Sequence, residues 1–247
     1  MSVWAIADTH LAFSAPERSM EMFGAPWVGY VRKLGERWRA CVAEDDLVLL
    51  AGDISWATKP AAVVADLEWL DALPGKKVLV RGNHDYWWPS SRIKLQRLMP
   101  PSIHALQHDA WQWGDVAICG TRLWDAPDVD CNSLVAWRGK GPSKRTEEDD
   151  RIYQRELIRL QEALAALVQL PATHRICLTH YPPINPDLTP SAVSRLIESS
   201  GVQFSLFGHL HCLHPNLPRP LFGLHNNTHY ILTSSDDLNF TPLKIMD

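Results

Sequence analysis

The chain has 247 residues, a hydrophobic share of 46% and a formal net charge of −4. This share of apolar residues is typical of globular proteins and argues against extended disorder. The mildly negative charge does not favour bulk binding to nucleic acid or to an anionic membrane surface. No apolar run is long enough to span a bilayer, and we expect no signal peptide. The five cysteines are scattered and form no CxxC pair, so we expect a reducing, cytoplasmic location.

Apolar runs of strand length alternate with longer amphipathic stretches along the chain. We expect core strands at 3–7, 47–51, 77–81, 116–119, 175–179, 203–207 and 230–233. Runs this rich in leucine and β-branched residues are typical of strands covered on both faces. The alternation favours an α/β fold with a single domain over residues 1–247.

Three helices are expected between these runs. Their ends are marked by Thr58 and Pro74, by Thr146 and Pro171, and by Thr189 and Gly201. The middle helix, at about 147–170, opens with a capping box made by Thr146 and Asp149. The segment 125–145 is polar and contains Gly139 and Pro142, so it is expected to be a loop over the site.

Side chains that can bind a metal follow five of the expected strands. They lie in Asp8-Thr9-His10, Gly52-Asp53, Gly82-Asn83-His84-Asp85, His180 and Gly208-His209-Leu210-His211. Because the carboxyl ends of strands form the ligand crevice of an open α/β sheet, these groups are expected to gather in one place.

The types of ligand suit two divalent transition-metal ions. The set contains two carboxylates, one amide and four imidazoles, and no thiolate; its members are Asp8, His10, Asp53, Asn83, His180, His209 and His211. Mixed oxygen and nitrogen ligands favour Mn, Fe, Co or Zn over Ca. Asp53 stands alone at its strand end and is the candidate to bridge both ions.

The ordered set D-x-H, G-D, G-N-H-D, H and G-H-x-H, from Asp8 to His211, resembles the calcineurin-like metallophosphoesterases. The wider sequence around Gly52 and Gly82 is similar to a group of small bacterial predicted phosphohydrolases. The resemblance implies a four-layer α/β/β/α sandwich with two mixed β-sheets. It also implies hydrolysis of a phosphomonoester or phosphodiester by a metal-bridging hydroxide, with His84 as general acid.

The family pattern also implies how the ligands divide. One ion would be held by Asp8, His10, Asp53 and His211, and the other by Asp53, Asn83, His180 and His209. The protein Ser/Thr phosphatases of this superfamily carry Asp-Arg-Gly after the G-D motif, whereas this chain continues with Ile54-Ser55-Trp56. The departure argues against a phosphoprotein substrate and leaves small phosphoesters or diesters.

Several alternatives stay open from the sequence. Arg122 could bind a substrate phosphate or form an ion pair, and Trp56 could line a substrate pocket or pack in the core. Asp85 could orient a neighbour or cap the next turn. A lipid-headgroup phosphohydrolase at a membrane surface and a non-catalytic metal-binding scaffold are the alternative functions. A nuclease would need a basic groove, which the net charge does not suggest.

Overall fold

The structure is a computed structural model that describes residues 1–136, 141 and 144–247. The chain forms two compact units. The first consists of Met1–Gln107 together with Thr233–Asp247, and the second of His108–Leu232. The predicted α/β fold with two mixed β-sheets flanked by helices is confirmed. The assignment of residues 1–247 to a single domain stays a prediction.

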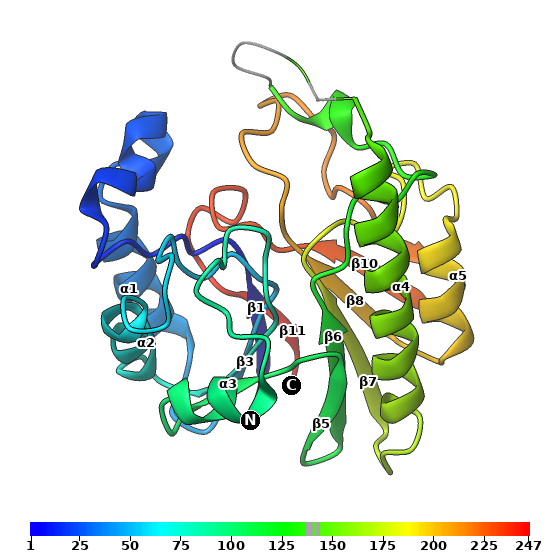
Figure 1. Ribbon diagram of the computed structural model, residues 1–247, viewed down its shortest axis with the longest axis horizontal. Helices are drawn as coiled ribbons and strands as arrows, with labels where there is room; N and C mark the ends of the chain where they lie inside the picture. The colour runs from blue at the N-terminus through cyan, green and yellow to red at the C-terminus, as the bar shows by residue number, and fades with distance from the viewer. Residues whose placement is uncertain (137–140, 142–143) are drawn as a thin grey trace. The chain divides into compact units, whose positions relative to one another are not determined.

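The first unit is built on a five-stranded sheet in the order β11-β1-β2-β3-β4. Its strands are β1 (Val3–Ile6), β2 (Leu47–Leu50), β3 (Lys76–Leu79), β4 (Ile103–Ala105) and β11 (Leu243–Met246). β1 to β4 are parallel, and β11 pairs antiparallel with β1. The two chain ends therefore lie together, and the Ser2 hydroxyl is 3.1 Å from a carboxylate oxygen of Asp247 (Figure 1).

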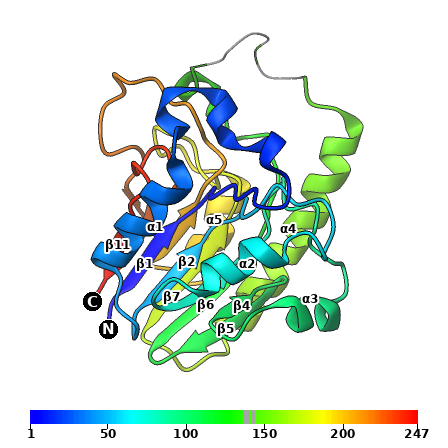
Figure 2. The ribbon, with the colours of Figure 1, turned by 90° about the vertical axis from the view of Figure 1, so that its left-hand side faces the viewer.

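Helices of the first unit pack on this sheet. They are α1 (Tyr30–Cys41), α2 (Val64–Asp71) and α3 (Arg92–Leu98), preceded by the 3-10 helices η1 (Pro16–Arg18), η2 (Met20–Phe23) and η3 (Ala25–Trp27). Figure 2 shows α1 and α2 with the strands β1 and β2. One apolar core contains Leu34 of α1, Leu67 of α2 and Leu50 of β2, all buried. Burial of such side chains is the main stabilising contribution to a unit of this kind.

The second unit has a six-stranded sheet in the order β5-β6-β7-β8-β10-β9. Its strands are β5 (Asp109–Trp113), β6 (Val116–Thr121), β7 (His174–Thr179), β8 (Phe204–Phe207), β9 (Leu224–His225) and β10 (Thr228–Leu232). The four inner strands are parallel, and the two edge strands are antiparallel to their neighbours. The sheet is mixed, and its parallel strands all end at the same edge.

Helices α4 (Glu147–Leu167) and α5 (Ala192–Ser199) cover the sheet of the second unit, and η4 (Asn132–Leu134) is a short 3-10 helix (Figure 1). α4 begins with the predicted capping box, in which Thr146 and Asp149 each bond the other's backbone N–H. Its buried residues Leu160 and Leu164 share a core with β6 and β7. The helix therefore fixes the position of the two strands beneath it.

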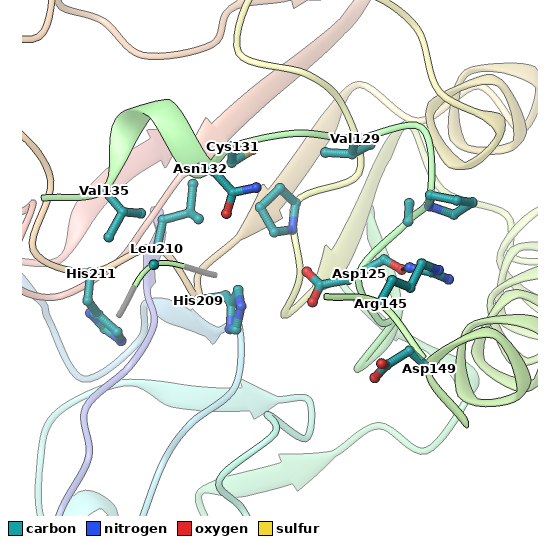
Figure 3. A pocket seen from close by; sticks show the side chains of 14 residues that line it. Asp125, Val129, Cys131, Asn132, Val135, Arg145, Asp149, His209, Leu210 and His211 are labelled. Carbon is teal, nitrogen blue, oxygen red and sulfur yellow. Dashed lines mark hydrogen bonds between the residues drawn. The ribbon is translucent and has the colours of Figure 1, made fainter. Parts of the chain in front are cut away.

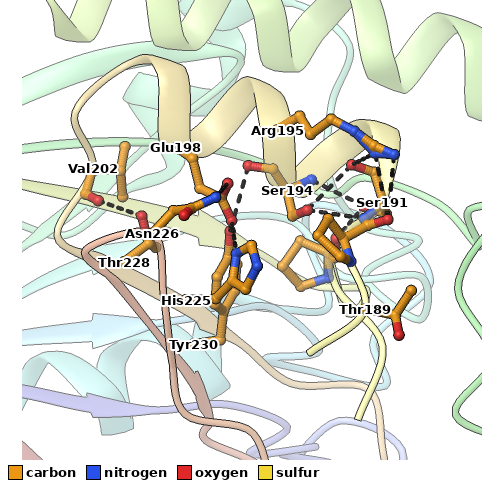
Figure 4. A network of polar contacts seen from close by, with 12 residues as sticks. Thr189, Ser191, Ser194, Arg195, Glu198, Val202, His225, Asn226, Thr228 and Tyr230 are labelled. Carbon is orange, nitrogen blue, oxygen red and sulfur yellow. Dashed lines mark hydrogen bonds and ion pairs between the residues drawn. The ribbon is translucent and has the colours of Figure 1, made fainter. Parts of the chain in front are cut away.

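A polar network ties the β9–β10 hairpin to α5 (Figure 4). The Glu198 carboxylate accepts hydrogen bonds from the Tyr230 hydroxyl at 2.8 Å and from the Asn226 amide at 2.9 Å, and it pairs with His225 Nδ1 at 2.8 Å. Burial opposes the ionised form of Glu198, but these hydrogen bonds outweigh it and lower its pKa. The network holds β10 next to β8, the strand that leads to the G-H-x-H motif.

The structure corrects two predicted helix starts. The first helix begins at Val64 rather than near Thr58, because the Ala62 N–H donates to Lys59 O and closes a tight turn instead. The third begins after Ser191, whose hydroxyl accepts from the Ser194 N–H. At its end Gly201 has the left-handed backbone expected of a residue that terminates a helix.

The predicted loop at 125–145 is only partly described. Its Gly139 and Pro142 lie outside the described residues. The described part contains η4 and an isolated β-bridge between Val135 and Leu213, so the segment is more ordered than expected. In the described part of the chain, no helix combines the length and apolar character needed to cross a bilayer.

Candidate metal centre

Three of the predicted ligands in the first unit have an uncommon backbone. Asp8, His10 and Asp53 have φ angles of 59°, 43° and 52°, in the left-handed region. A side chain there costs free energy on the order of 1 kcal/mol, so such residues persist where the surrounding structure fixes them, often at functional sites. In this unit hydrogen bonds between two adjacent segments provide that constraint.

The segments that follow β1 and β2 remain paired beyond the ends of the strands. The Asp8 N–H donates to Gly52 O at 2.9 Å, and the His10 N–H donates to Asp53 O at 3.0 Å. His10 Nε2 consequently lies 3.6 Å from Asp53 Oδ2. Ligand atoms of Asp8 lie within 4.8 Å of those of His10 and of Asp53. The first two motifs therefore meet within the first unit.

The chemistry of this group suits a divalent cation. Asp8, His10 and Asp53 are all buried, and their ligand atoms are two carboxylate oxygens and an imidazole nitrogen. Buried carboxylates this close are costly unless positive charge compensates them. Oxygen and nitrogen ligands of this kind are used for Mn, Fe and Zn. The residues present fit a metal ion.

The third motif is held against Asp53 by a close backbone approach. A Cβ added at Gly82 would lie 2.0 Å from Asp53 Oδ1, so only glycine fits there. The His84 N–H donates to the same oxygen at 2.8 Å. This turn places Asn83, a predicted ligand, between two residues that contact the Asp53 side chain.

Asp85 connects the second and third motifs. Its buried carboxylate accepts hydrogen bonds from the backbone N–H groups of Gly82 (2.7 Å), Ile54 (2.9 Å) and Ser55 (3.1 Å), and from Trp87 Nε1 (2.9 Å). Burial, and then the nearby Asp53 carboxylate, raise its pKa. Of the two alternatives left by the sequence, orientation of neighbouring residues is the one observed.

Aromatic rings surround His10 and His84 in the first unit. Trp56 stacks on His10 with ring centroids 5.0 Å apart, and its centroid is 4.3 Å from that of His84. Trp56 also packs against the apolar core of the unit. Core packing is thus observed for Trp56, and its contact with substrate stays a prediction.

In the second unit, His180 and His209 lie side by side. His180 follows β7 and is buried, and its N–H donates to Arg122 O at 3.0 Å. His209 follows β8 with a φ of 71°, and its ring centroid is 5.2 Å from that of His180. The backbone bond from the Gly208 N–H to His180 O, at 3.1 Å, joins the two motifs.

A row of stacked side chains supports His209. Tyr181 lies 4.0 Å from the His209 ring and Trp124 lies 5.0 Å from Tyr181, measured between ring centroids. The Arg122 guanidinium covers Trp124 at 4.6 Å and pairs with buried Glu156 at 3.0 Å. The ion pair is therefore present, and phosphate binding by Arg122 stays a prediction. Apart from its position after His180, nothing in the sequence singles out Tyr181 as a site residue.

His209 and His211 also line a pocket of about 580 Å³ in the second unit (Figure 3). Its wall includes apolar side chains and three charged residues, Asp125, Arg145 and Asp149. Concave sites of this size, with apolar walls and few charged groups, are typical of small-molecule binding. The sequence placed the segment that carries Asp125 over the site but did not identify any of the three as a site residue.

The predicted residues thus gather within each unit. Asp8, His10 and Asp53 form one group with Asn83 and His84 on the adjoining turn, and His180 and His209 form another with His211 on the same loop. The division of all seven ligands between two ions stays a prediction.

Comparisons with known proteins identify the family. A profile described as calcineurin-like phosphoesterase matches residues 1–213. The chain is 34% identical to the Gene 66 protein of Mycobacterium phage D29 over 101 residues, which are 39% of this chain and 48% of that protein. It is 39% identical to the Gene 66 protein of Mycobacterium phage L5 over 59 residues, 24% of this chain and 28% of that protein. The chain therefore spans about half the length, or less, of these relatives.

Two solved structures align with most of this chain, and one of them has a similar fold. The crystal structure of a phosphopantetheinyl hydrolase from Mycobacterium tuberculosis matches with a TM-score of 0.55 and 14% identity, over 99% of this chain and 95% of that one. A protein of unknown function from Aquifex aeolicus matches with a TM-score of 0.48 and 13% identity, over 98% and 95%. Because the family profile covers most of the chain and its motifs form the groups described above, the chain belongs to the calcineurin-like phosphoesterase family.

Proposed function

We propose that this protein is a dinuclear-metal phosphoesterase that hydrolyses a small phosphomonoester or phosphodiester. The observation that carries the proposal is a group of three buried side chains, Asp8, His10 and Asp53, that follow two adjacent strands. The ligand atoms of His10 and of Asp53 lie within 4.8 Å of those of Asp8. Family membership supports two ions, and Asp53 as their common ligand. Asn83, His180, His209 and His211 complete the proposed set.

Bound ions of this kind lower the pKa of water and offset the charge of the phosphoryl oxygens. The chain's own contribution to proton transfer is assigned to His84. Its backbone N–H is held by Asp53 and its ring lies against Trp56, so the imidazole has a fixed direction. A positioned imidazole can donate a proton to a departing alkoxide near neutral pH.

The proposed substrate is small rather than a phosphoprotein, since Ile54-Ser55-Trp56 replaces the Asp-Arg-Gly of the protein phosphatases. In this chain the backbone N–H groups of Ile54 and Ser55 both donate to Asp85, so the segment after Asp53 is bound to the turn that carries Asn83. Arg122 and Trp56 are further candidates for substrate contact.

The test combines metal analysis with a substrate panel. Protein loaded with Mn, Fe or Zn should contain two ions per chain and should hydrolyse phosphomonoesters or phosphodiesters. Asp53→Asn should lose both properties. A stoichiometry of one ion or less would contradict the dinuclear centre. Full occupancy with no turnover of any ester, aryl phosphates included, would favour the non-catalytic scaffold.

One observation favours the lipid-headgroup alternative. The segment that follows His10 carries exposed apolar side chains, among them Met22 (71% exposed) and Val28 (57% exposed). Apolar side chains of this kind can insert at a membrane surface. Co-sedimentation with lipid vesicles tests this alternative. If the segment inserts, the unmodified protein should bind the vesicles and the double variant Met22→Ser, Val28→Ser should not. If the unmodified protein stays in the supernatant, this alternative is excluded.

A further inference from the structure

The pocket of the second unit contains one carboxylate that accepts no hydrogen bond in the described part of the chain. Asp125 follows β6 by four positions and lines the pocket together with His209 and His211 (Figure 3). Its carboxylate makes no hydrogen bond or ion pair with any other residue among 1–136, 141 and 144–247, although Arg145 and His180 lie near enough to favour its charged form. A carboxylate on a pocket wall with no hydrogen bond of its own is a ready acceptor for a ligand.

The other two charged residues of the wall are already engaged. Both oxygens of Asp149 accept hydrogen bonds, one from the Thr146 N–H at 2.8 Å and the other from Trp124 Nε1 at 3.2 Å. The Arg145 guanidinium donates to Asp125 O at 2.6 Å and pairs with Asp150 at 2.5 Å. Neither side chain is as available to a ligand as the carboxylate of Asp125.

The charge of this wall selects against anions. Two carboxylates and one guanidinium line the pocket in its described part, and the guanidinium is paired with a further carboxylate. A ligand group that carries a second phosphate or carboxylate would meet repulsion there, whereas an ammonium or hydroxyl group would be attracted.

Apolar side chains form part of the pocket wall. Leu210, Val129 and Val135 are among the lining residues, and Leu210 and Val135 lie on the side of His211 (Figure 3). In Figure 3 the carboxylate of Asp125 points to the side on which His209 lies. A phosphoester bound at His209 and His211 could therefore place a short carbon chain along the apolar wall and the end of that chain near Asp125.

We infer that Asp125 is a specificity-determining residue, and that the preferred substrates are phosphoesters whose alcohol portion ends in a hydrogen-bond donor, above all an ammonium group. The inference rests on the proposed phosphoesterase function, because it needs the phosphoryl group to bind at the histidines. The inference specifies the chemical class of the leaving group, which the proposed function leaves open.

Non-hydrolysable ligands test the inference without turnover. Alkylphosphonates of two to six carbons that end in an amine, a methyl group or a carboxylate are titrated into the Mn-loaded protein by calorimetry. For the unmodified protein the amine should bind more tightly than the methyl compound of equal length, and the carboxylate more weakly. In Asp125→Asn the amine-to-methyl ratio of affinities should fall by about two- to fivefold, which is typical of an ion pair at an exposed carboxylate.

A matched variant controls for the general effect of charge. Glu148→Gln removes a carboxylate at an exposed position of α4 that does not line the pocket. It should leave the ratio as in the unmodified protein, and far-UV circular dichroism should show that both variants are folded. An equal ratio in Asp125→Asn and the unmodified protein overturns the inference, as does an equal fall in both variants.

The corresponding alkyl phosphates separate this inference from the proposed function. If they are hydrolysed without dependence on Asp125, the specificity is wrong and the phosphoesterase stands. If the phosphonates show the Asp125-dependent preference while the phosphates are not hydrolysed, the specificity stands and the proposed function fails.

Discussion

Asp85→Asn tests whether one buried carboxylate sets the geometry of the first-unit ligands. Three donors, Ile54 N–H, Ser55 N–H and Trp87 Nε1, share one oxygen of Asp85, and the Gly82 N–H uses the other. An asparagine can offer its oxygen to only one side. If it satisfies the three donors, its NH₂ group faces the Gly82 N–H, and that bond is lost.

The magnitude follows from these contacts. A hydrogen bond to a charged group contributes about 1.5–3 kcal/mol, and the three remaining bonds weaken when the acceptor becomes neutral. The loss is partly offset, because burial and the Asp53 carboxylate disfavour the ionised form of Asp85 and raise its pKa. We expect a net destabilisation on the order of 2 kcal/mol. The turn carrying Asn83 would also shift relative to Asp53, which should weaken metal binding about 10–100-fold.

The assay is titration of Mn into the metal-free protein, followed by kcat measured at saturating metal. Asp46→Asn is the matched control, since Asp46 is also buried and accepts from two backbone N–H groups and Trp4 Nε1. It lies before β2, away from the metal-binding turns. It should lower stability without changing metal affinity. Wild-type affinity in Asp85→Asn, or an equal loss in Asp46→Asn, would refute the positioning role.

Three further predictions use separate measurements. Asp53→Asn should lower metal content and kcat more than Asp8→Asn, because Asp53 is the proposed common ligand; equal effects would mean that the bridge is wrongly assigned. His84→Asn should retain its metals while kcat falls by about 10²–10⁴-fold for alkyl esters and less for p-nitrophenyl phosphate; loss of metal would identify His84 as a ligand. Burial lowers the pKa of Lys77 to about 8, below that of an unfolded lysine, so the unfolded chain binds more protons between about pH 8 and 10 and stability should rise with pH there. Urea denaturation gives the free energy of unfolding of the unmodified protein and of Lys77→Met at pH 7.5 and 9.5. The unmodified protein should gain about 1 kcal/mol relative to the variant between these pH values, after allowance for solvent screening. The same difference in free energy at both pH values would contradict the burial argument.

The sequence predicted the inner strands well because their signal is strong. β1, β2, β6, β7, β8 and β10 begin within one or two residues of the expected positions. These strands are apolar and form the middle of a sheet, where both faces are covered. The edge strands β5, β9 and β11 and the three-residue β4 were missed, since their residues are mostly half-buried or the strand is short. Short edge strands have too few alternating positions to predict.

Helix α1 was missed for a different reason. Tyr30, Leu34 and Trp38 are spaced by four and are all buried, so an apolar face is present in the sequence. The helix, however, starts after Gly29, which has a φ of 66° and provides no side-chain cap. Without a capping residue the start of the helix was not recognisable, although its periodicity could have been found.

At the site, the sequence could predict which side chains follow strands but not what holds them. The left-handed residues Asp8, His10 and Asp53 lie two to four residues after the ends of β1 and β2, in motifs that the sequence alone identifies. The four donors to Asp85 come from two segments about 30 residues apart in the chain, a relation that only the folded structure reveals. The same holds for Trp56, whose contacts with His10 and His84 depend on the pairing of separate segments.

The middle residue of the D-x-H motif shows why a spacing of two works at this position. Thr9 is buried between Asp8 and His10, and its hydroxyl donates to Ile54 O at 2.9 Å. The neighbouring backbone bonds run from Asp8 to Gly52 and from His10 to Asp53. Thr9 therefore adds a third hydrogen bond to the same segment, while its two neighbours, both with positive φ, present their ligand atoms close to one another. The spacing serves metal binding because the residue between the ligands attaches the motif to the segment that carries Asp53.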